Sequence, residues 1–145
     1  MKSSAVVIDA NIAIFQVIEG PVSAKVEKCW SDWIDEDRNI CAPRLWLNEI
    51  TSVLHKIVSL NSIDKDHATE ALEKLLGLGV ELYTEDADSC RRAFTWASLM
   101  NQRQAYDGFY LALAEQLQAE FWTADRRMAN TTRNLGVEWV HWVGE

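Results

Sequence analysis

The fold is decided by the stretch Ala5-Val6-Val7-Ile8-Asp9, in which four apolar residues lead directly into an acid. A short, continuous apolar run is typical of a strand that is buried on both faces, as the strands of a parallel sheet are. Helical periodicity follows over residues 11–18. The stretch therefore predicts the first strand–helix unit of an α/β domain. It is too short for the apolar part of a secretion signal or for a membrane-spanning helix, so we expect a cytoplasmic protein with no membrane contact.

The alternation of strand and helix continues along the whole chain. We expect strands over residues 5–8, 39–42, 80–83, 120–123 and 137–142. We expect helices over residues 11–18, 21–35, 45–60, from 62 or 64 to 77, from 84 to 102, 106–118 and 126–135. Pro21 suits the first turn of the second helix, and Thr84 is the expected cap of the fifth. No linker or repeat interrupts the pattern, which predicts a single α/β domain over residues 1–145 with a mostly parallel five-stranded sheet.

Composition limits the classes of function. The chain has 145 residues, 48% of them hydrophobic, which is enough for a packed core. It carries 14 Lys and Arg against 22 Asp and Glu, a net charge of −8, which argues against binding nucleic acid or anionic membranes through bulk charge. Three Cys without a C-x-x-C spacing indicate free thiols in a reducing compartment. The three His form no cluster, so a zinc site has little support.

Three acids are expected at the edge of the sheet where its strands end, which is where open parallel sheets bind ligands. Asp9 follows the first strand, Asp125 follows the fourth, and Asp107 lies in the first turn of the helix that leads into the fourth strand. Each one alone is explained as a helix cap, for which Asp is a preferred residue. All three together weaken that explanation, because like charges held close raise each other's pKa unless a cation is present.

A fourth acid, Glu49, lies on the helix expected over residues 45–60. It is about 60° from Trp46 around the helix, at the border of the apolar stripe. Such a position suits a boundary residue that keeps its carboxylate in water, or a ligand that points into a cleft. Four carboxylates without a matching Lys or His are typical oxygen ligands for Mg²⁺ or Mn²⁺. The chemistry that these ions support is phosphoryl transfer or phosphodiester hydrolysis.

Four segments around these acids resemble the PIN-domain nucleases, and most nearly the VapC-like toxins of bacterial toxin–antitoxin pairs. The segments are Val7-Ile8-Asp9-Ala10-Asn11, Pro43-Arg44-Leu45-Trp46-Leu47-Asn48-Glu49, Ala105-Tyr106-Asp107-Gly108-Phe109-Tyr110-Leu111-Ala112-Leu113-Ala114 and Thr123-Ala124-Asp125. Each segment alone is common, and it is their order, spacing and placement that carry the resemblance. Gly108 stands where the family usually has another small residue. The presence of all four acids argues against a degenerate, inactive member.

The resemblance implies a PIN-like fold with three layers, α/β/α, and the activity of a metal-dependent endoribonuclease. It implies that Asp9, Glu49, Asp107 and Asp125 are both the catalytic residues and the ligands of Mg²⁺ or Mn²⁺. Asn11 and Thr123 match the polar positions that support this pocket. The implied partners are an RNA substrate, a cognate antitoxin protein and a second copy of the chain in a homodimer.

The type of cleavage and the path of the RNA can also be inferred from residue types. No His lies in the four segments, so attack by the 2′-hydroxyl of the RNA lacks its usual general acid and base. We therefore expect hydrolysis by water that leaves a 5′-phosphate. Arg44, Arg126 and Arg127 are the candidates for guiding the RNA backbone past the acidic field, although a solvent-facing role explains them equally well.

Two alternatives belong to other classes of function. The first is a non-catalytic PIN-like interaction module whose acidic cleft binds a basic peptide and needs no metal. The second is a phosphatase of the haloacid-dehalogenase kind with Asp9 as its nucleophile. That class has a second Asp two residues after the first, and this chain has Asn11 there.

Overall fold

The computed structural model describes residues 4–145 and contains a sheet of five parallel strands in the order β3-β2-β1-β4-β5. The strands are β1 (Ala5–Ile8), β2 (Asn39–Pro43), β3 (Glu81–Tyr83), β4 (Glu120–Thr123) and β5 (Val140–Trp142). The apolar run of β1 lies at the centre, where Val7 pairs with Cys41 on one side and Phe121 on the other. All four residues of β1 are buried, which is why the sequence shows no alternation of polar and apolar residues there.

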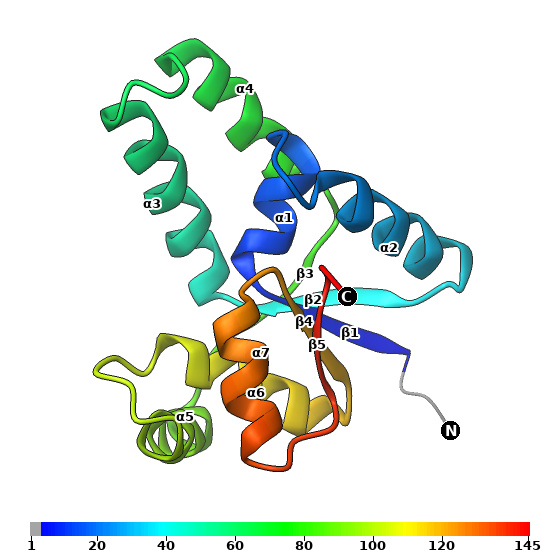
Figure 1. Cartoon of the computed structure of the whole chain (residues 1–145), viewed down its shortest axis with the longest axis vertical. Coiled ribbons are helices and arrows are strands. Elements are labelled where there is room, and N and C mark those ends of the chain that lie inside the picture. The colour runs from blue at the N-terminus through cyan, green and yellow to red at the C-terminus, as the bar shows by residue number, and fades with distance from the viewer. Residues whose placement is uncertain (1–3) are drawn as a thin grey trace.

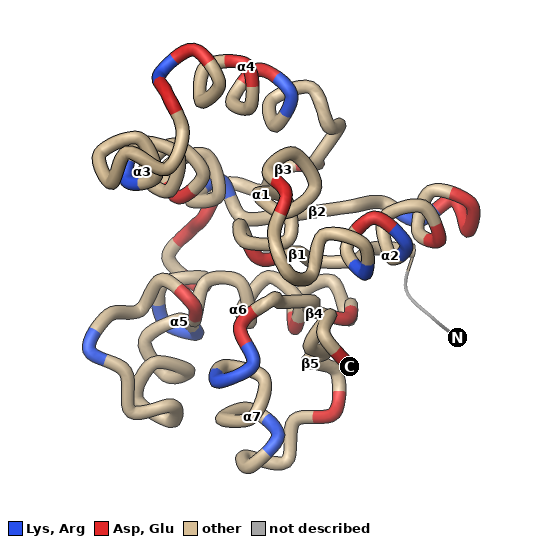
Figure 2. Tube along the Cα trace, turned by 45° about the horizontal axis from the view of Figure 1, so that its top comes forward, with Lys and Arg blue, Asp and Glu red and all other residues tan. Residues whose placement is uncertain are grey.

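Helices cover both faces of the sheet. They are α1 (Ala10–Val17), α2 (Ser23–Asp35), α3 (Leu45–Ser59), α4 (Lys65–Leu76), α5 (Ala87–Leu99), α6 (Tyr106–Leu117) and α7 (Arg126–Asn134). Figure 1 shows α1–α4 on one side of the sheet and α5–α7 on the other. Charged residues lie mainly on the helices, and β1 and β2 carry none (Figure 2). The predicted α/β fold with a three-layer α/β/α architecture is confirmed. Within residues 4–145, no helix is long and apolar enough to span a membrane.

Two predicted helix starts are wrong, for local reasons. Pro21 lies in a turn before α2, in which the backbone N–H of Gly20 donates to Ser23 Oγ at 2.8 Å. Thr84 does not cap α5. The cap is Asp86, whose side chain accepts from the Ser89 N–H at 2.8 Å while Ser89 Oγ accepts from the Asp86 N–H at 3.3 Å. This reciprocal pair satisfies two helix-end donors, which a cap at Thr84 would leave open.

Two element ends also differ from the prediction. The fifth helix ends at Leu99 instead of residue 102, because Asn101 adopts a left-handed conformation with φ 55° and the N–H of Gln102 turns back to the Ala97 carbonyl at 3.0 Å. The last strand begins at Val140 instead of residue 137, because the N–H of Val137 closes the end of α7. The earlier end of α5 leaves a loop over residues 100–105 that faces the carboxyl edge of the sheet.

The packing of α5 against α6 depends on a missing side chain. A Cβ atom added to Gly108 would lie 2.4 Å from the backbone oxygen of Ala93, so no larger residue fits without separating the helices. Gly108 directly follows Asp107. The close contact therefore also fixes the position of the first turn of α6 and of the acid that it carries.

Gly108→Ala should lower the free energy of unfolding by about 1–3 kcal/mol, because backbone atoms of α5 cannot move aside as a flexible side chain would. The measurement is urea denaturation. Gly77→Ala is the matched control, because φ is −92° there and an added Cβ would meet its nearest atom at an ordinary 3.4 Å. Equal stability of the two variants would contradict the inferred close contact.

Candidate active site

Asp9 lies directly after the central strand, where its side chain becomes part of a buried polar network. Its carboxylate accepts a hydrogen bond from Thr123 Oγ1 at 2.8 Å, and its backbone N–H donates to the Trp122 carbonyl at 2.9 Å. Asn11 Nδ2 lies 3.4 Å from both Asp9 Oδ2 and Thr123 Oγ1, and Asn11 Oδ1 accepts from the Ala124 N–H at 2.9 Å. Asp9 stands at the N-cap position of α1, but its side chain makes no cap hydrogen bond. Helix capping therefore does not explain this acid.

Burial makes the charged form of Asp9 unfavourable. Its pKa is raised from 3.8 to about 7, first by desolvation, then by the charge of Asp107, and to a lesser extent by the charge of Glu49. The hydrogen bond from Thr123 acts in the opposite direction by favouring the carboxylate. Asp9 is only 9% exposed, and no Lys, Arg or His side chain within residues 4–145 forms an ion pair with it, so its charge is compensated only in part.

Asp107 reaches the same region from the first turn of α6. Gln102, in the loop that follows α5, donates a hydrogen bond from Nε2 to Asp107 Oδ2 at 2.9 Å. The pKa of Asp107 is raised, mainly by desolvation and also by the charge of Asp125, while the bond from Gln102 lowers it. Gln102 therefore orients this acid and stabilises its charge. No pattern in the sequence indicates this role, because loop residues have no periodicity.

Glu49 approaches the other acids from α3. Desolvation raises its pKa, the charge of Asp107 adds to the rise, and the nearby hydroxyl of Tyr110 lowers it. Glu49 Oε1 and the Tyr110 hydroxyl are both buried, yet neither has a hydrogen-bond partner among the described residues. The Tyr110 hydroxyl therefore lies close enough to Glu49 to favour its charged form, and neither buried atom has a further partner among the described residues. Tyr110 follows Asp107 by three residues, so helical spacing could have placed it on the same face.

Asp125 combines two roles. Its side chain accepts a hydrogen bond from the Met128 N–H at 3.2 Å and so caps α7, which is the role that its position alone predicts. Its backbone N–H also donates to Thr123 Oγ1 at 3.0 Å, which connects it to the network around Asp9. Because Asp125 also raises the pKa of Asp107, the structure brings all four predicted acids into one electrostatic cluster.

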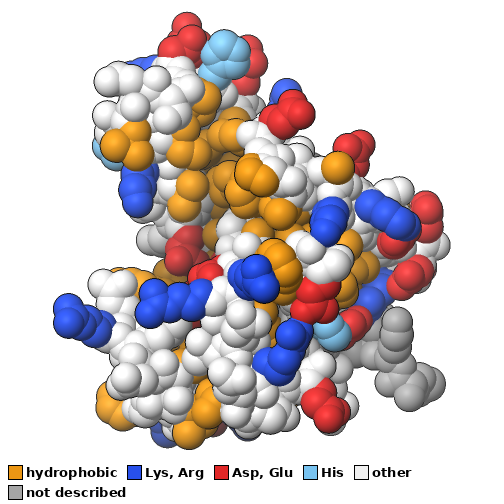
Figure 3. Space-filling model, in the orientation of Figure 1, with side chains coloured by type: hydrophobic (Ala, Val, Ile, Leu, Met, Phe, Trp, Pro, Cys, Tyr) orange, Lys and Arg blue, Asp and Glu red, His pale blue; other side chains and the backbone are white. Residues whose placement is uncertain are grey.

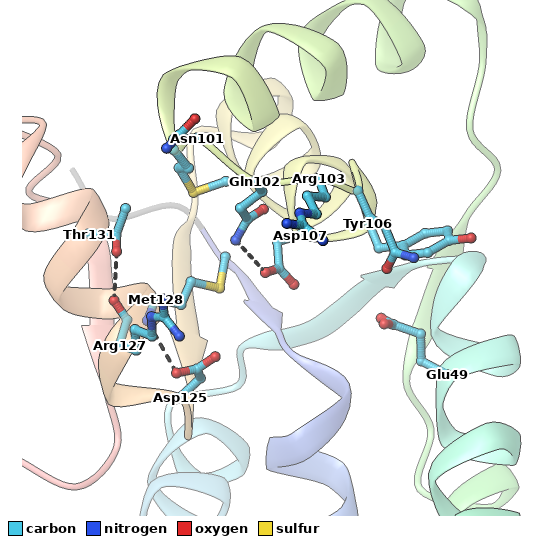
Figure 4. Close-up of a pocket in the computed structure, with 12 residues that line it drawn as sticks. Glu49, Asn101, Gln102, Arg103, Tyr106, Asp107, Asp125, Arg127, Met128 and Thr131 are labelled. Atoms are coloured by element: carbon cyan, nitrogen blue, oxygen red, sulfur yellow. Dashed lines mark hydrogen bonds between the residues drawn. The ribbon is translucent and has the colours of Figure 1, made fainter.

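A cavity of about 650 Å³ opens beside this cluster, and Figure 4 shows the residues that line it. Glu49, Asp107 and Asp125 contribute to its wall, while Asp9 is buried behind it. Figure 3 shows acidic side chains at the inner end of a hollow between α3 and the α5–α7 half, with basic side chains along its lower rim. The cavity is therefore open to an incoming ligand and acidic at its inner end.

The three arginines selected from the sequence lie in different surroundings. Arg127 lines the cavity. Arg126 lies with its guanidinium 5.1 Å from the centre of the Trp142 ring, and Arg44 is exposed at the N-terminal end of α3; neither lines the cavity. Arg103, in the loop before α6, does line it and was not selected from the sequence.

The donor atoms at this site fit a hard divalent cation. The ligand atoms are carboxylate oxygens, one of them the unpartnered Glu49 Oε1, and no Lys or Arg side chain forms an ion pair with any of the four acids in the described residues. Within residues 4–145, however, no three Asp, Glu, His or Cys side chains are grouped closely enough to form a ready cage. Mg²⁺ commonly keeps several waters and binds through one or two carboxylates, which agrees with this wider spacing.

Comparison with known protein families identifies the family of this chain. The model of a family described as the PIN domain matches residues 7–139, which include all four acids. The chain belongs to the PIN-domain family. No curated protein sequence matches it significantly.

Several solved structures share the PIN fold of this chain. The crystal structure of FitAcB from Neisseria gonorrhoeae is 16% identical, with 97% of this chain and 99% of that chain covered and a TM-score of 0.66. A toxin–antitoxin complex from Klebsiella pneumoniae is 16% identical, with 95% and 97% covered and a TM-score of 0.61. VapC20 of Mycobacterium tuberculosis, a sarcin-ricin loop cleaving toxin, is 12% identical, with 86% and 94% covered and a TM-score of 0.61.

Metal-free PIN protein should lose stability as the pH rises from about 4 to about 7. The raised pKa of Asp9 means that the folded state keeps a proton in this range which the unfolded state has released, so deprotonation favours unfolding. Asp9→Asn should flatten this fall and exceed wild type in stability at pH 8, by an amount on the order of 1.4 kcal/mol per pKa unit. Urea denaturation in EDTA across this pH range measures the effect.

Asp86→Asn is the control for this pH dependence. The pKa of Asp86 is lowered by its hydrogen bonds with Ser89, so the stabilisation that Asp86 provides is lost as the pH falls, opposite in direction to the effect of Asp9.

Adding Mn²⁺ at pH 8 should raise the melting temperature of wild type more than that of Asp9→Asn. Identical melting of wild type and Asp9→Asn with and without Mn²⁺ would contradict the placement of the site.

Gln102→Ala should weaken Mn²⁺ binding by about 10-fold, because a carboxylate that loses its orienting donor is a poorer ligand. The measurement is isothermal titration calorimetry on the full chain. Asn130→Ala is the control, since this amide is exposed on α7 and makes no hydrogen bond to an acid among the described residues. An unchanged affinity in Gln102→Ala would show that the hydrogen bond to Asp107 does not matter for metal binding.

Proposed function

We propose that this PIN-domain protein is a metal-dependent endoribonuclease, the toxin of a toxin–antitoxin pair. The observation that carries the proposal is the cluster of four acids beside an open cavity, three of which, Asp9, Glu49 and Asp107, have raised pKa values. Like charges are unfavourable so close together unless a cation joins them, and such clusters are typical of sites that bind divalent metals for phosphate chemistry. The sarcin-ricin loop cleaving activity of VapC20, which shares the fold, supports RNA as the substrate.

Each acid has a distinct task in this proposal. Asp9, fixed by Thr123 and Asn11, is the buried ligand on which Mg²⁺ or Mn²⁺ would sit, while Asp107 and Glu49 face it from α6 and α3. Asp125 adds negative charge from the start of α7. When bound, the ion lowers the pKa of water and offsets the charge that develops on the scissile phosphate.

The products should carry 5′-phosphates. None of the three His lines the cavity. His67 is hydrogen-bonded to Asp64, His141 Nε2 lies 3.1 Å from Glu120 Oε2, and His55 is exposed on α3. The chain therefore offers no imidazole to take the proton of an RNA 2′-hydroxyl, the step that leads to a cyclic phosphate. Water activated at the acidic cluster is the nucleophile that the arrangement supports.

An antitoxin is the proposed protein partner. Solved structures with the same fold include toxin–antitoxin complexes, among them the one from Klebsiella pneumoniae. Figure 3 shows hydrophobic side chains gathered over α1–α4, and such a surface suits coverage by an apolar segment of a partner. A homodimer stays a prediction of the family resemblance.

The alternatives fit the site less well. A module that binds a basic peptide needs accessible carboxylates, whereas Asp9 is 9% exposed and has its pKa raised to about 7. The match to the PIN family contradicts a haloacid-dehalogenase phosphatase. Asn11 also has a different task from a second acid, because it joins Asp9 to the backbone of Ala124.

Purified protein should cleave single-stranded or loop RNA in Mg²⁺ or Mn²⁺ and should lose this activity in EDTA. Asp9→Asn and Asp107→Asn should each lower kcat/KM on the order of 100-fold, the loss typical when a group that stabilises transition-state charge is removed. Gel analysis of labelled RNA with end-group determination measures rate and product type.

Asp88→Asn is the matched control for these substitutions, because Asp88 is exposed on α5, pairs with Arg92 and lies outside the cavity. It should cleave RNA like wild type. Activity that persists in EDTA, or fragments that end in 2′,3′-cyclic phosphates, would overturn the proposed mechanism.

A further inference from the structure

The cavity extends well beyond the acids. At about 650 Å³ it falls in the size range of pockets that hold a small organic molecule, and a hydrated divalent ion fills only part of it. Its other wall comes from the loop between α5 and α6 and from α7. Polar or aromatic side chains on that wall are Asn101, Gln102, Arg103, Gln104, Tyr106 and Arg127. Apart from Gln102, which orients Asp107, the groups that line this space have no part in holding a metal.

The loop backbone is fixed while its side chains are free. The N–H groups of Asn101 and Gln102 close the end of α5, and Met100 is 6% exposed in the core. Gln102 turns inward to Asp107. Within residues 4–145, the side chains of Asn101, Arg103 and Gln104 make no hydrogen bond or ion pair, and all three are exposed. The fixed start of the loop lowers the backbone entropy that is lost when a ligand binds, and the side chains supply unused donors and acceptors.

The chemistry of these side chains matches an unpaired nucleotide. The amides of Asn101 and Gln104 offer both donors and acceptors, which suit the edge of a base. Tyr106 is 50% exposed, and its ring can stack on the face of a base. Arg103 and Arg127 supply the cations that hold phosphates. In Figure 4, Tyr106 lies above Glu49 at one end of the cavity and Asn101 lies at the opposite end of the loop, with Asp107 between them, while Asp125 lies beside Arg127.

We propose that the loop Asn101–Tyr106 is a specificity subsite for one unpaired RNA nucleotide, the one that adjoins the cleaved phosphate. Tyr106 stacks on the base, Gln104 binds its edge, and Arg103 and Arg127 hold the flanking phosphates. The nucleotide must be unpaired, because base pairing and stacking in a duplex occupy the edge and faces that the loop contacts. Its place next to the scissile bond follows from the single hydrogen bond that joins Gln102 to Asp107. This inference rests on the proposed nuclease function.

The test compares loop variants of the full-length protein on a single-stranded RNA library in Mn²⁺. Tyr106→Ala should raise KM about 5- to 150-fold, the equivalent of 1–3 kcal/mol for one stacked base. Tyr106→Phe keeps the ring and should behave like wild type. Gln104→Ala should flatten the base preference at one position next to the cut.

Matched controls are available elsewhere on the surface. Phe94 is an aromatic residue of α5 that is 73% exposed and does not line the cavity, so Phe94→Ala should not change KM. Arg103→Gln should reduce the slope of log Kd for RNA against log salt by about 0.7, the value for one lost single-strand phosphate contact. Arg91→Gln, on the outer face of α5, should leave that slope unchanged.

The outcomes separate the two proposals. If wild type cleaves RNA but the Tyr106→Ala and Gln104→Ala variants keep its KM and base preference, the subsite is wrong and the nuclease function stands. If wild type neither binds nor cleaves any RNA, both are overturned. Equal urea midpoints for wild type and the loop variants would show that the changes in KM do not come from unfolding.

Discussion

The position of the Asp9 carboxyl is the constraint on which the rest of the structure depends. Because β1 is buried on both faces, the residue that follows it emerges into an environment with little water. The neighbouring strand ends at Thr123, whose hydroxyl is the strongest partner of this acid at 2.8 Å. That bond stabilises the carboxylate but does not outweigh burial and the charge of Asp107, so the pKa stays near 7. A bound cation would resolve this conflict, and folding would then be coupled to metal binding.

How much of the site can be predicted follows from where each residue lies. Asp9, Asp107 and Asp125 stand directly after a strand or in the first turn of a helix, and parallel strands bring such positions to one edge. Gln102 could not be predicted, because its direction depends on the left-handed turn at Asn101 that ends α5 early. Arg103 was missed for the same reason. The direction of a loop side chain is set by tertiary packing, which leaves no periodic signal in the sequence.

The acidic cluster lowers the stability of the fold, because its buried carboxylates are partly uncompensated. The dense packing around it holds these acids in place. Tyr110 contributes to both the core and the site, because its ring centre lies 5.8 Å from that of Phe121 while its hydroxyl lies beside Glu49 and lowers the pKa of that acid. On the other face of α6, Gly108 allows α5 to approach so closely that the first turn has one position. Dense packing of this kind holds unfavourable groups in place, and sites that bind ligands commonly show such local conflicts.

The charge of the whole molecule then shapes how an anionic substrate reaches the site. The net charge of −8 repels RNA at long range, and Figure 2 shows basic residues distributed over the helices instead of gathered in one patch. Attraction must therefore come from short-range contacts at the cavity, where Arg103 and Arg127 stand beside the acids. A protein that binds in this way gains little from non-specific phosphate contacts. In the proposed nuclease, the choice of RNA would then depend on the few side chains that touch a base, so the loop with unused amides would matter more than the overall electrostatic field.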